Sequence, residues 1–148
     1  MKQNKPEFKF TGVAEEDLEE EIVLIAGGEI GPIRDWITRA LKNGTDKNIR
    51  LFFGANTQND LNGYRNLKDL SELSNNFNMV TALNTSNPEW EGEVGLITDV
   101  VRDKLDPKKV SKCFLYGTDV MIEETKRTLT GLGIPEDKIQ HESFKRTR

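Results

Sequence analysis

The feature that most constrains this 148-residue chain is a repeated unit, in which a short continuous apolar run precedes a stretch with helical periodicity. Such runs are typical of parallel strands buried on both faces. The apolar runs are residues 22–26, 49–53, 79–83 and 113–116, and a fifth short strand is expected over 139–144. The helical stretches are about 32–41, 64–73, 96–105 and 121–132. This order predicts an α/β fold, with an open, doubly wound parallel sheet of five strands and helices on both faces.

The composition suits one folded domain with a polar leading segment. Apolar residues make up 35% of the chain and charged residues 31%, which is enough apolar content for a core. Residues 1–21 are highly polar and end in an acidic run. We therefore expect a polar N-terminal segment or linker over 1–21 and the α/β domain over 22–148.

Charge, hydropathy and cysteine content exclude several classes of function. The net charge of −4 argues against a nucleic-acid partner. No apolar run approaches the roughly 20 residues that span a bilayer, so we expect no membrane insertion. Cys113 is the single cysteine, which excludes an internal disulfide and fits a cytoplasmic, reducing setting. The carboxylates show no spacing typical of a metal site.

Glycines follow three of the predicted strands. They are Gly27-Gly28, Gly54 and Gly117. Open α/β sheets bind ligands beyond the carboxyl ends of their strands, where glycine allows close approach of the backbone. For Gly54 alone a tight strand-to-helix turn is the preferred interpretation, whereas Gly27-Gly28 together with Gly117 predicts a binding site.

Five motifs in order resemble the nucleotide-binding half of the ferredoxin–NADP reductase-like superfamily. They are Ala26-Gly27-Gly28-Glu29-Ile30-Gly31-Pro32, Leu51-Phe52-Phe53-Gly54-Ala55-Asn56-Thr57 with Asp60-Leu61, Trp90-Glu91-Gly92-Glu93-Val94-Gly95, Tyr116-Gly117-Thr118-Asp119-Val120-Met121, and Gly133-Ile134-Pro135 with Glu142-Ser143-Phe144. The resemblance covers about residues 22–144. It is closest to the reductase components of bacterial multicomponent monooxygenases, such as methane monooxygenase reductase.

The resemblance implies a sheet order of 3-2-1-4-5 and binding of NADH, which passes a hydride to a flavin in a neighbouring barrel domain. The implied cofactor-binding residues are Gly27, Gly28, Glu29, Pro32, Ala55, Asn56, Thr57, Tyr116, Gly117, Thr118, Asp119 and Met121. The flavin motif Arg-x-Tyr-Ser is absent, so FAD is expected only through a partner domain. The loop after the second strand has no basic residue before Arg65, which favours NADH over NADPH.

Three residues depart from the family pattern. Glu29 replaces a Thr-Gly pair in the phosphate turn, where its carboxylate would repel a pyrophosphate unless it points away. Tyr116 replaces a cysteine and could fill part of the nicotinamide pocket. Asp119 replaces a proline, and the preferred interpretation is that it caps the fourth helix.

The remaining candidates favour structural roles. His141 has no aligned nucleophile, Cys113 is expected to be a buried thiol, and Trp36 and Trp90 are expected to pack rather than bind.

Two functions remain open. The chain is either the NADH-binding module of a flavin-dependent electron-transfer oxidoreductase or a cofactor-free docking or regulatory subunit of an oxidoreductase complex. The intact motif order favours the first. Both require an oxidoreductase or flavin-domain partner, and neither makes the chain catalytic alone, since it is at most half of a reductase.

Overall fold

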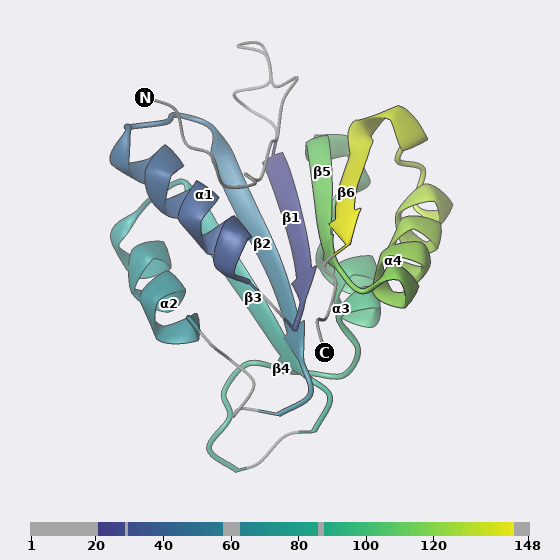
Figure 1. The fold of residues 1–148 in the computed structure, drawn as a ribbon, viewed down its shortest axis with the longest axis horizontal. Helices are drawn as coiled ribbons and strands as arrows, with labels where there is room; N and C mark the ends of the chain where they lie inside the picture. The colour runs from purple at the N-terminus through teal and green to yellow at the C-terminus, as the bar shows by residue number, and fades with distance from the viewer. Residues whose placement is uncertain (1–20, 29, 58–62, 86–87, 144–148) are drawn as a thin grey trace.

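A computed structural model of the chain describes residues 21–28, 30–57, 63–85 and 88–143. Strands and helices alternate as the sequence predicts (Figure 1). The strands are β1 (Glu21–Gly27), β2 (Asn48–Ala55), β3 (Phe77–Leu83), β4 (Glu93–Val94), β5 (Val110–Gly117) and β6 (Ile139–Ser143). The helices are α1 (Gly31–Lys42), α2 (Tyr64–Leu73), α3 (Ile97–Lys104) and α4 (Asp119–Gly131), with short 3₁₀ turns at Pro107–Lys109 and Glu136–Lys138.

The sheet is parallel throughout, in the order β4-β3-β2-β1-β5-β6. Its five longer strands have the order that the family resemblance implied. The prediction of five strands was wrong, because β4 adds a sixth. Glu93 and Val94 pair with Ala82 and Leu83 at the edge of the sheet. A two-residue strand is too short to produce an apolar run, so the sequence pattern could not reveal it.

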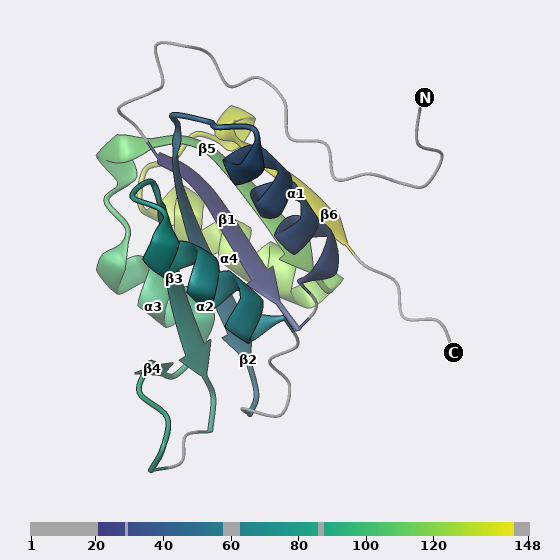
Figure 2. The ribbon, with the colours of Figure 1, turned by 90° about the vertical axis from the view of Figure 1, so that its left-hand side faces the viewer.

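Helices cover both faces of the sheet, with α1 and α2 on one side and α3 and α4 on the other (Figure 2). Alternation along the strands divides the core accordingly. Leu24 of β1 and Phe53 of β2 pack with Ile33 and Ile37 of α1. Ile25 of β1 packs in the opposite layer, which α3 and α4 complete.

The second helix buries only part of its leucine repeat. Leu67, Leu70 and Leu73 recur every third residue along α2, but Leu73 is 83% exposed. A helix turns about 100° per residue, so the six-residue step from Leu67 to Leu73 places Leu73 roughly 120° around the axis from Leu67. Leu67 is fully buried and Leu70 is partly buried against the same layer.

The first strand begins at Glu21, one residue earlier than predicted. The Glu21 carboxylate lies 3.3 Å from Nε of Arg50, and Nη1 of Arg50 donates to the Lys104 carbonyl at the end of α3. The Arg50 guanidinium also lies 5.7 Å from the centre of the Phe52 ring. Arg50 therefore joins β1, β2 and α3 at the amino end of the sheet. Among the residues that the structure describes, no helix is long and apolar enough to span a membrane.

Candidate functional site

The carboxyl ends of the parallel strands meet at one edge of the sheet, the lower edge in Figure 1. Along the chain, β1, β2 and β3 proceed in one direction across the sheet, and β5 and β6 then occupy the other side of β1. The winding therefore reverses between β1 and β5. In open α/β sheets this reversal is where ligands bind, and Gly27 and Gly117 end the two strands that flank it.

The turn after β1 has a conformation that glycine favours. Gly28 has a φ of +84°, and its N–H donates to the Gly54 carbonyl at 3.1 Å. Helix α1 follows with no side-chain cap at Ile30, with no acidic residue in its first turn, and with Pro32 in the first turn as predicted. Its N-terminal donors are the N–H groups of Gly31 and Ile33, because Pro32 has none and the Arg34 N–H donates to the Ile30 carbonyl. N–H groups at the start of a helix are the arrangement that binds anions. Glu29 lies outside the described residues.

Met121 lies across both glycines at the reversal point. A Cβ on Gly27 would lie 3.4 Å from Cγ of Met121, and a Cβ on Gly117 would overlap its sulfur. The missing side chains at these two positions therefore accommodate the thioether of Met121, which is partly buried in the layer under α4. The glycine pattern predicted open space for a ligand, and the structure shows that Met121 uses part of that space.

Gly54 has a structural role, in agreement with its preferred interpretation, but for a different reason. A Cβ at Gly54 would lie 2.8 Å from Cβ of Ile97 at the start of α3. Gly54 is the penultimate residue of β2 rather than part of a turn. It lacks a side chain because α3 packs closely on the strand.

The Tyr116 side chain packs in the core, although its backbone pairs with Ala26 beside the reversal point. It is 8% exposed and belongs to the layer beneath α1, with Ala26 and Ile33. Met121 belongs to the opposite layer. Side chains alternate along β5, so Tyr116 and the open side of Gly117 face opposite sides of the sheet.

The cap of α4 is Thr118, so the prediction that Asp119 caps this helix was wrong. The Thr118 backbone is extended, with φ −74° and ψ 164°, and its hydroxyl oxygen accepts a hydrogen bond from the Met121 N–H at 3.2 Å. Asp119 is the first helical residue. Both residue types cap helices well, and the position at which the backbone turns helical decides between them.

The loop after β2 is joined to the end of β3. Asn84 N–H donates to the Ala55 carbonyl, and Thr85 N–H donates to the Asn56 carbonyl, each at 3.0 Å. The Asn84 side-chain amide donates to Oδ1 of Asn56 at 2.7 Å. Asn84 was not among the predicted site residues. The sequence feature that could have identified Asn84 is its position directly after the third predicted strand, which lies beside β2.

The Trp-x-Gly-x-x-Gly motif forms the approach to β4. The Trp90 indole N–H donates to the Glu93 carbonyl at 2.8 Å, and a Cβ on Gly92 would overlap the Trp90 ring. The ring centres of Trp90 and Tyr64 are 5.7 Å apart. Trp90 therefore packs within the protein, as predicted, and Trp36 packs against the layer under α1.

One cation at this edge lies outside the loop after β2, the loop on which the preference for NADH over NADPH rests. Nη1 of Arg34, from the first turns of α1, lies 2.8 Å from the position of a Cβ on Gly63, which precedes α2. Residues 34 and 63 are distant in sequence, so only the packing of α1 beside α2 brings this guanidinium to the start of α2.

The two titratable candidates differ in burial. Burial raises the pKa of the Cys113 thiol to about 12, with a smaller opposing effect from the Lys138 ammonium. The expectation of a buried thiol is confirmed. His141 is exposed on the edge strand β6, as predicted. Within the described part of the chain, no three His, Cys, Asp or Glu side chains are grouped so that they could hold a metal ion.

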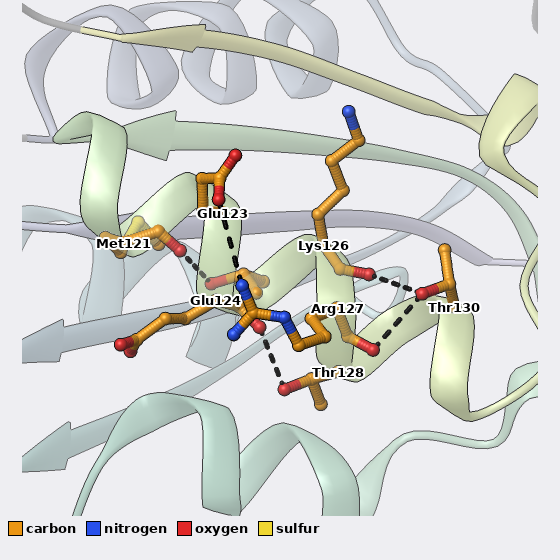
Figure 3. A network of polar contacts seen from close by, with 8 residues as sticks. Met121, Glu123, Glu124, Lys126, Arg127, Thr128 and Thr130 are labelled. Atoms are coloured by element: carbon orange, nitrogen blue, oxygen red, sulfur yellow. Dashed lines mark hydrogen bonds and ion pairs between the residues drawn. The ribbon is translucent and has the colours of Figure 1, made fainter.

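Several polar side chains of α4 make their contacts within the helix itself (Figure 3). The hydroxyls of Thr125, Thr128 and Thr130 donate to carbonyls one turn earlier, and Glu123 lies 3.8 Å from Arg127. A groove of about 510 Å³ separates this helix from α3. It lies on a covering layer and not at the carboxyl edge of the strands.

Comparison with known proteins agrees with this fold. The family model "Oxidoreductase NAD-binding domain" matches residues 24–127. NADH-cytochrome b5 reductase 1 of Debaryomyces hansenii is 32% identical, and the match covers 80% of this chain and 44% of that protein. Ferredoxin–NAD(P)(+) reductase CarAd of Metapseudomonas resinovorans is 31% identical, with 73% of this chain and 32% of that protein covered.

Solved structures of related proteins share the fold. The cytochrome b5 reductase domain of Ulva prolifera nitrate reductase has a TM-score of 0.74 at 21% identity, covering 83% of this chain and 48% of that one. The ferredoxin reductase in carbazole 1,9a-dioxygenase has a TM-score of 0.69 at 28% identity, covering 85% of this chain and 38% of that one. This chain thus spans less than half of each relative. It belongs to the oxidoreductase NAD-binding domain family, the nucleotide-binding part of flavin-dependent electron-transfer reductases.

Proposed function

We propose that this chain is the NADH-binding module of a flavin-dependent electron-transfer oxidoreductase. In this proposal it acts with a flavin domain that a partner or a longer parent protein supplies. When bound, NADH supplies a hydride that the flavin accepts, and the domain contributes positioning and electrostatics. CarAd is itself named a ferredoxin reductase, which supports an electron-transfer role for a family member.

The observation that carries the proposal is the anion-binding geometry at the reversal point. Gly28 is in the left-handed region, and α1 begins three residues later at Gly31, with no side-chain cap at Ile30. The twelve-residue helix adds the positive end of its dipole to the N–H groups of Gly31 and Ile33, whereas Pro32 has no N–H. These donors and the dipole suit a pyrophosphate. We assign Gly27 and Gly28 to close approach of the backbone to the pyrophosphate and Pro32 to the first turn of the helix that faces it, and we assign Ala55, Asn56 and Thr57 to the adenosine.

The nicotinamide would lie near Gly117 and Thr118, over Met121. A thioether is flexible and polarizable, so Met121 can repack against a ring rather than exclude it. We keep NADH as the preferred cofactor, because residues 55–57 present no cation. Arg34 is the residue that could change this preference, since its guanidinium could pair with an additional phosphate.

A second candidate function, that of a cofactor-free docking subunit, is favoured by one observation. Met121 already contacts the positions where the two glycines lack side chains. Glu29 supports the same candidate from the sequence, because a carboxylate in the phosphate turn repels an anion.

The test is a titration of the isotope-labelled chain with NADH, NADPH and ADP-ribose, read from amide chemical shifts. Saturable NADH and ADP-ribose binding with shifts at Gly27, Gly28 and Gly117 is expected. The absence of shifts at millimolar ligand would contradict cofactor binding. Tighter binding of NADPH than of NADH would overturn the NADH preference, and Arg34→Gln should then remove the difference.

Glu29→Thr separates the two candidate functions. Glu136→Thr is the matched control, because it also removes a carboxylate from a turn. Glu136 is exposed and lies before β6, at the amino ends of the strands and away from the candidate site. If Glu29→Thr alone gains NADH binding that the parent chain lacks, the docking subunit becomes the better assignment. If both variants bind NADH as the parent does, Glu29 points away from the pyrophosphate.

A further inference from the structure

We propose that Met121 is an oxidation site, and that its conversion to the sulfoxide by a hydroperoxide repacks the ends of β1 and β5, so that a dinucleotide binds there more weakly. The effect on the dinucleotide rests on the proposed function, whereas the oxidation and the repacking do not. The inference gives a chemical modification to a residue that otherwise serves only as a contact.

The first observation is the position of the Met121 thioether against two glycines. A Cβ on Gly27 would lie 3.4 Å from Cγ, 3.5 Å from Sδ and 3.6 Å from Cε of Met121, and a Cβ on Gly117 would overlap Sδ. The sulfur therefore lies against the backbone of both strands that flank the reversal point. An atom added to this sulfur changes the packing at both strand ends.

The second observation is that the Met121 side chain is accessible while its backbone is fixed. Its N–H donates to the Thr118 hydroxyl oxygen at 3.2 Å, and its carbonyl accepts a hydrogen bond from the Thr125 hydroxyl at 2.7 Å (Figure 3). The residue is half-buried, so part of its side chain meets solvent. A peroxide can therefore reach the thioether, and any adjustment after oxidation must come from the side chain.

The oxidation itself is a two-electron step. A sulfur lone pair attacks one oxygen of hydrogen peroxide, and the O–O bond breaks as the S–O bond forms. The hydroxide that leaves takes the proton of the transferred hydroxyl and becomes water. The sulfur is oxidised and the peroxide is reduced, so no other reactant is needed. The product carries a polar oxygen acceptor on a side chain that was apolar.

The sulfoxide cannot keep the position of the thioether. A Cβ on Gly117 would already overlap the sulfur, so an oxygen atom has no room on that side. Met121 also packs against the apolar layer under α4, where an oxygen without a hydrogen-bond donor is costly. The oxygen must face solvent at the reversal point, or the side chain must leave the glycines. Either change replaces the flexible apolar contact that would receive the nicotinamide.

The experiment treats the isotope-labelled chain with millimolar hydrogen peroxide and locates each added oxygen by peptide mass spectrometry. Oxidation of Met121 should shift the amide resonances of Gly27 and Gly117 and weaken NADH binding by about tenfold, the effect of one unpaired polar group. Methionine sulfoxide reductase should reverse both changes. Met121→Leu keeps an apolar side chain of similar volume without the sulfur. Peroxide should leave the amide shifts and the NADH affinity of that variant, whatever its affinity is, unchanged.

Met79→Leu is the matched control. Met79 is also half-buried, but it packs in the opposite layer, under α1 and α2. This variant should respond to peroxide as the parent chain does, because it retains Met121. A response that Met79→Leu abolishes, or that Met121→Leu retains, would overturn the inference. Cys113 is present in both variants, so an effect of its oxidation would persist in Met121→Leu and count against Met121.

The outcome for NADH separates this inference from the proposed function. If the untreated chain binds NADH and oxidation of Met121 leaves the affinity unchanged, the inference is wrong and the function stands. If the untreated chain does not bind NADH at millimolar concentration, the proposed function is wrong, and the glycine amides decide the oxidation site. Shifts at Gly27 and Gly117 then support it. Their absence, or a failure of peroxide to oxidise Met121, overturns it.

Discussion

Gly54→Ala and Gly117→Ala should differ sharply in their effects on stability, although both add one methyl group beside a neighbouring side chain. At Gly54 the new Cβ would lie 2.8 Å from Cβ and 3.2 Å from Cγ2 of Ile97. These atoms are close to the α3 backbone on a β-branched residue, so no rotation of the side chain relieves the contact. Helix α3 would have to shift.

Overpacking of this kind costs about 1–3 kcal/mol, or a fall in Tm of roughly 2–12 °C for a chain of this size. At Gly117 the new Cβ would instead meet Sδ of Met121, near the end of a flexible side chain. Because Met121 can change its rotamer, we expect Gly117→Ala to cost less than about 1 kcal/mol.

The assay is urea unfolding followed by circular dichroism, with Gly131→Ala as the control. A Cβ on Gly131, the last residue of α4, has no neighbour within 4 Å. That substitution should stabilise the protein by about 0.4–1 kcal/mol, because alanine favours the helix more than glycine does and reduces the conformational entropy of the unfolded chain. The reasoning is refuted if Gly117→Ala destabilises the protein as much as Gly54→Ala does, or if Gly54→Ala is neutral.

The remaining predictions concern the helix cap and the buried thiol. Thr118→Ala should reduce the free energy of unfolding by about 1 kcal/mol, through loss of the cap on α4, and Asp119→Ala should reduce it by less. Urea unfolding tests this, and a larger effect for Asp119→Ala would contradict the cap assignment. The Cys113 thiol should resist a thiol reagent at pH 8 in buffer and react in urea, and rapid reaction of the native protein would contradict its burial. Because the pKa of Cys113 rises from 9.0 to about 12 on folding, the unfolded chain loses this proton first, and stability should fall as the pH rises from about 9 to 12. Cys113→Ala should show a smaller fall across the same pH range.

The sequence alone determined the fold class and the place of the candidate site. Continuous apolar runs identified four of the five longer strands, because strands buried on both faces need apolar residues throughout. The fifth, β6, is a largely polar edge strand. Gly27, Gly28 and Gly117 marked the reversal point, because each directly follows or ends a strand. The length and periodicity of these elements are local properties, so the residue pattern carries them.

Tertiary packing decided what individual residues do. Gly54 is required by Ile97, and Gly117 accommodates Met121, yet as glycines after apolar runs they look alike in the sequence. Strand β4 forms because the Trp90 loop brings two residues to the edge of the sheet, and Asn84 reaches Asn56 because β3 lies beside β2. These outcomes depend on distances between residues that are far apart along the chain. Only the folded packing sets those distances, and no local pattern records them.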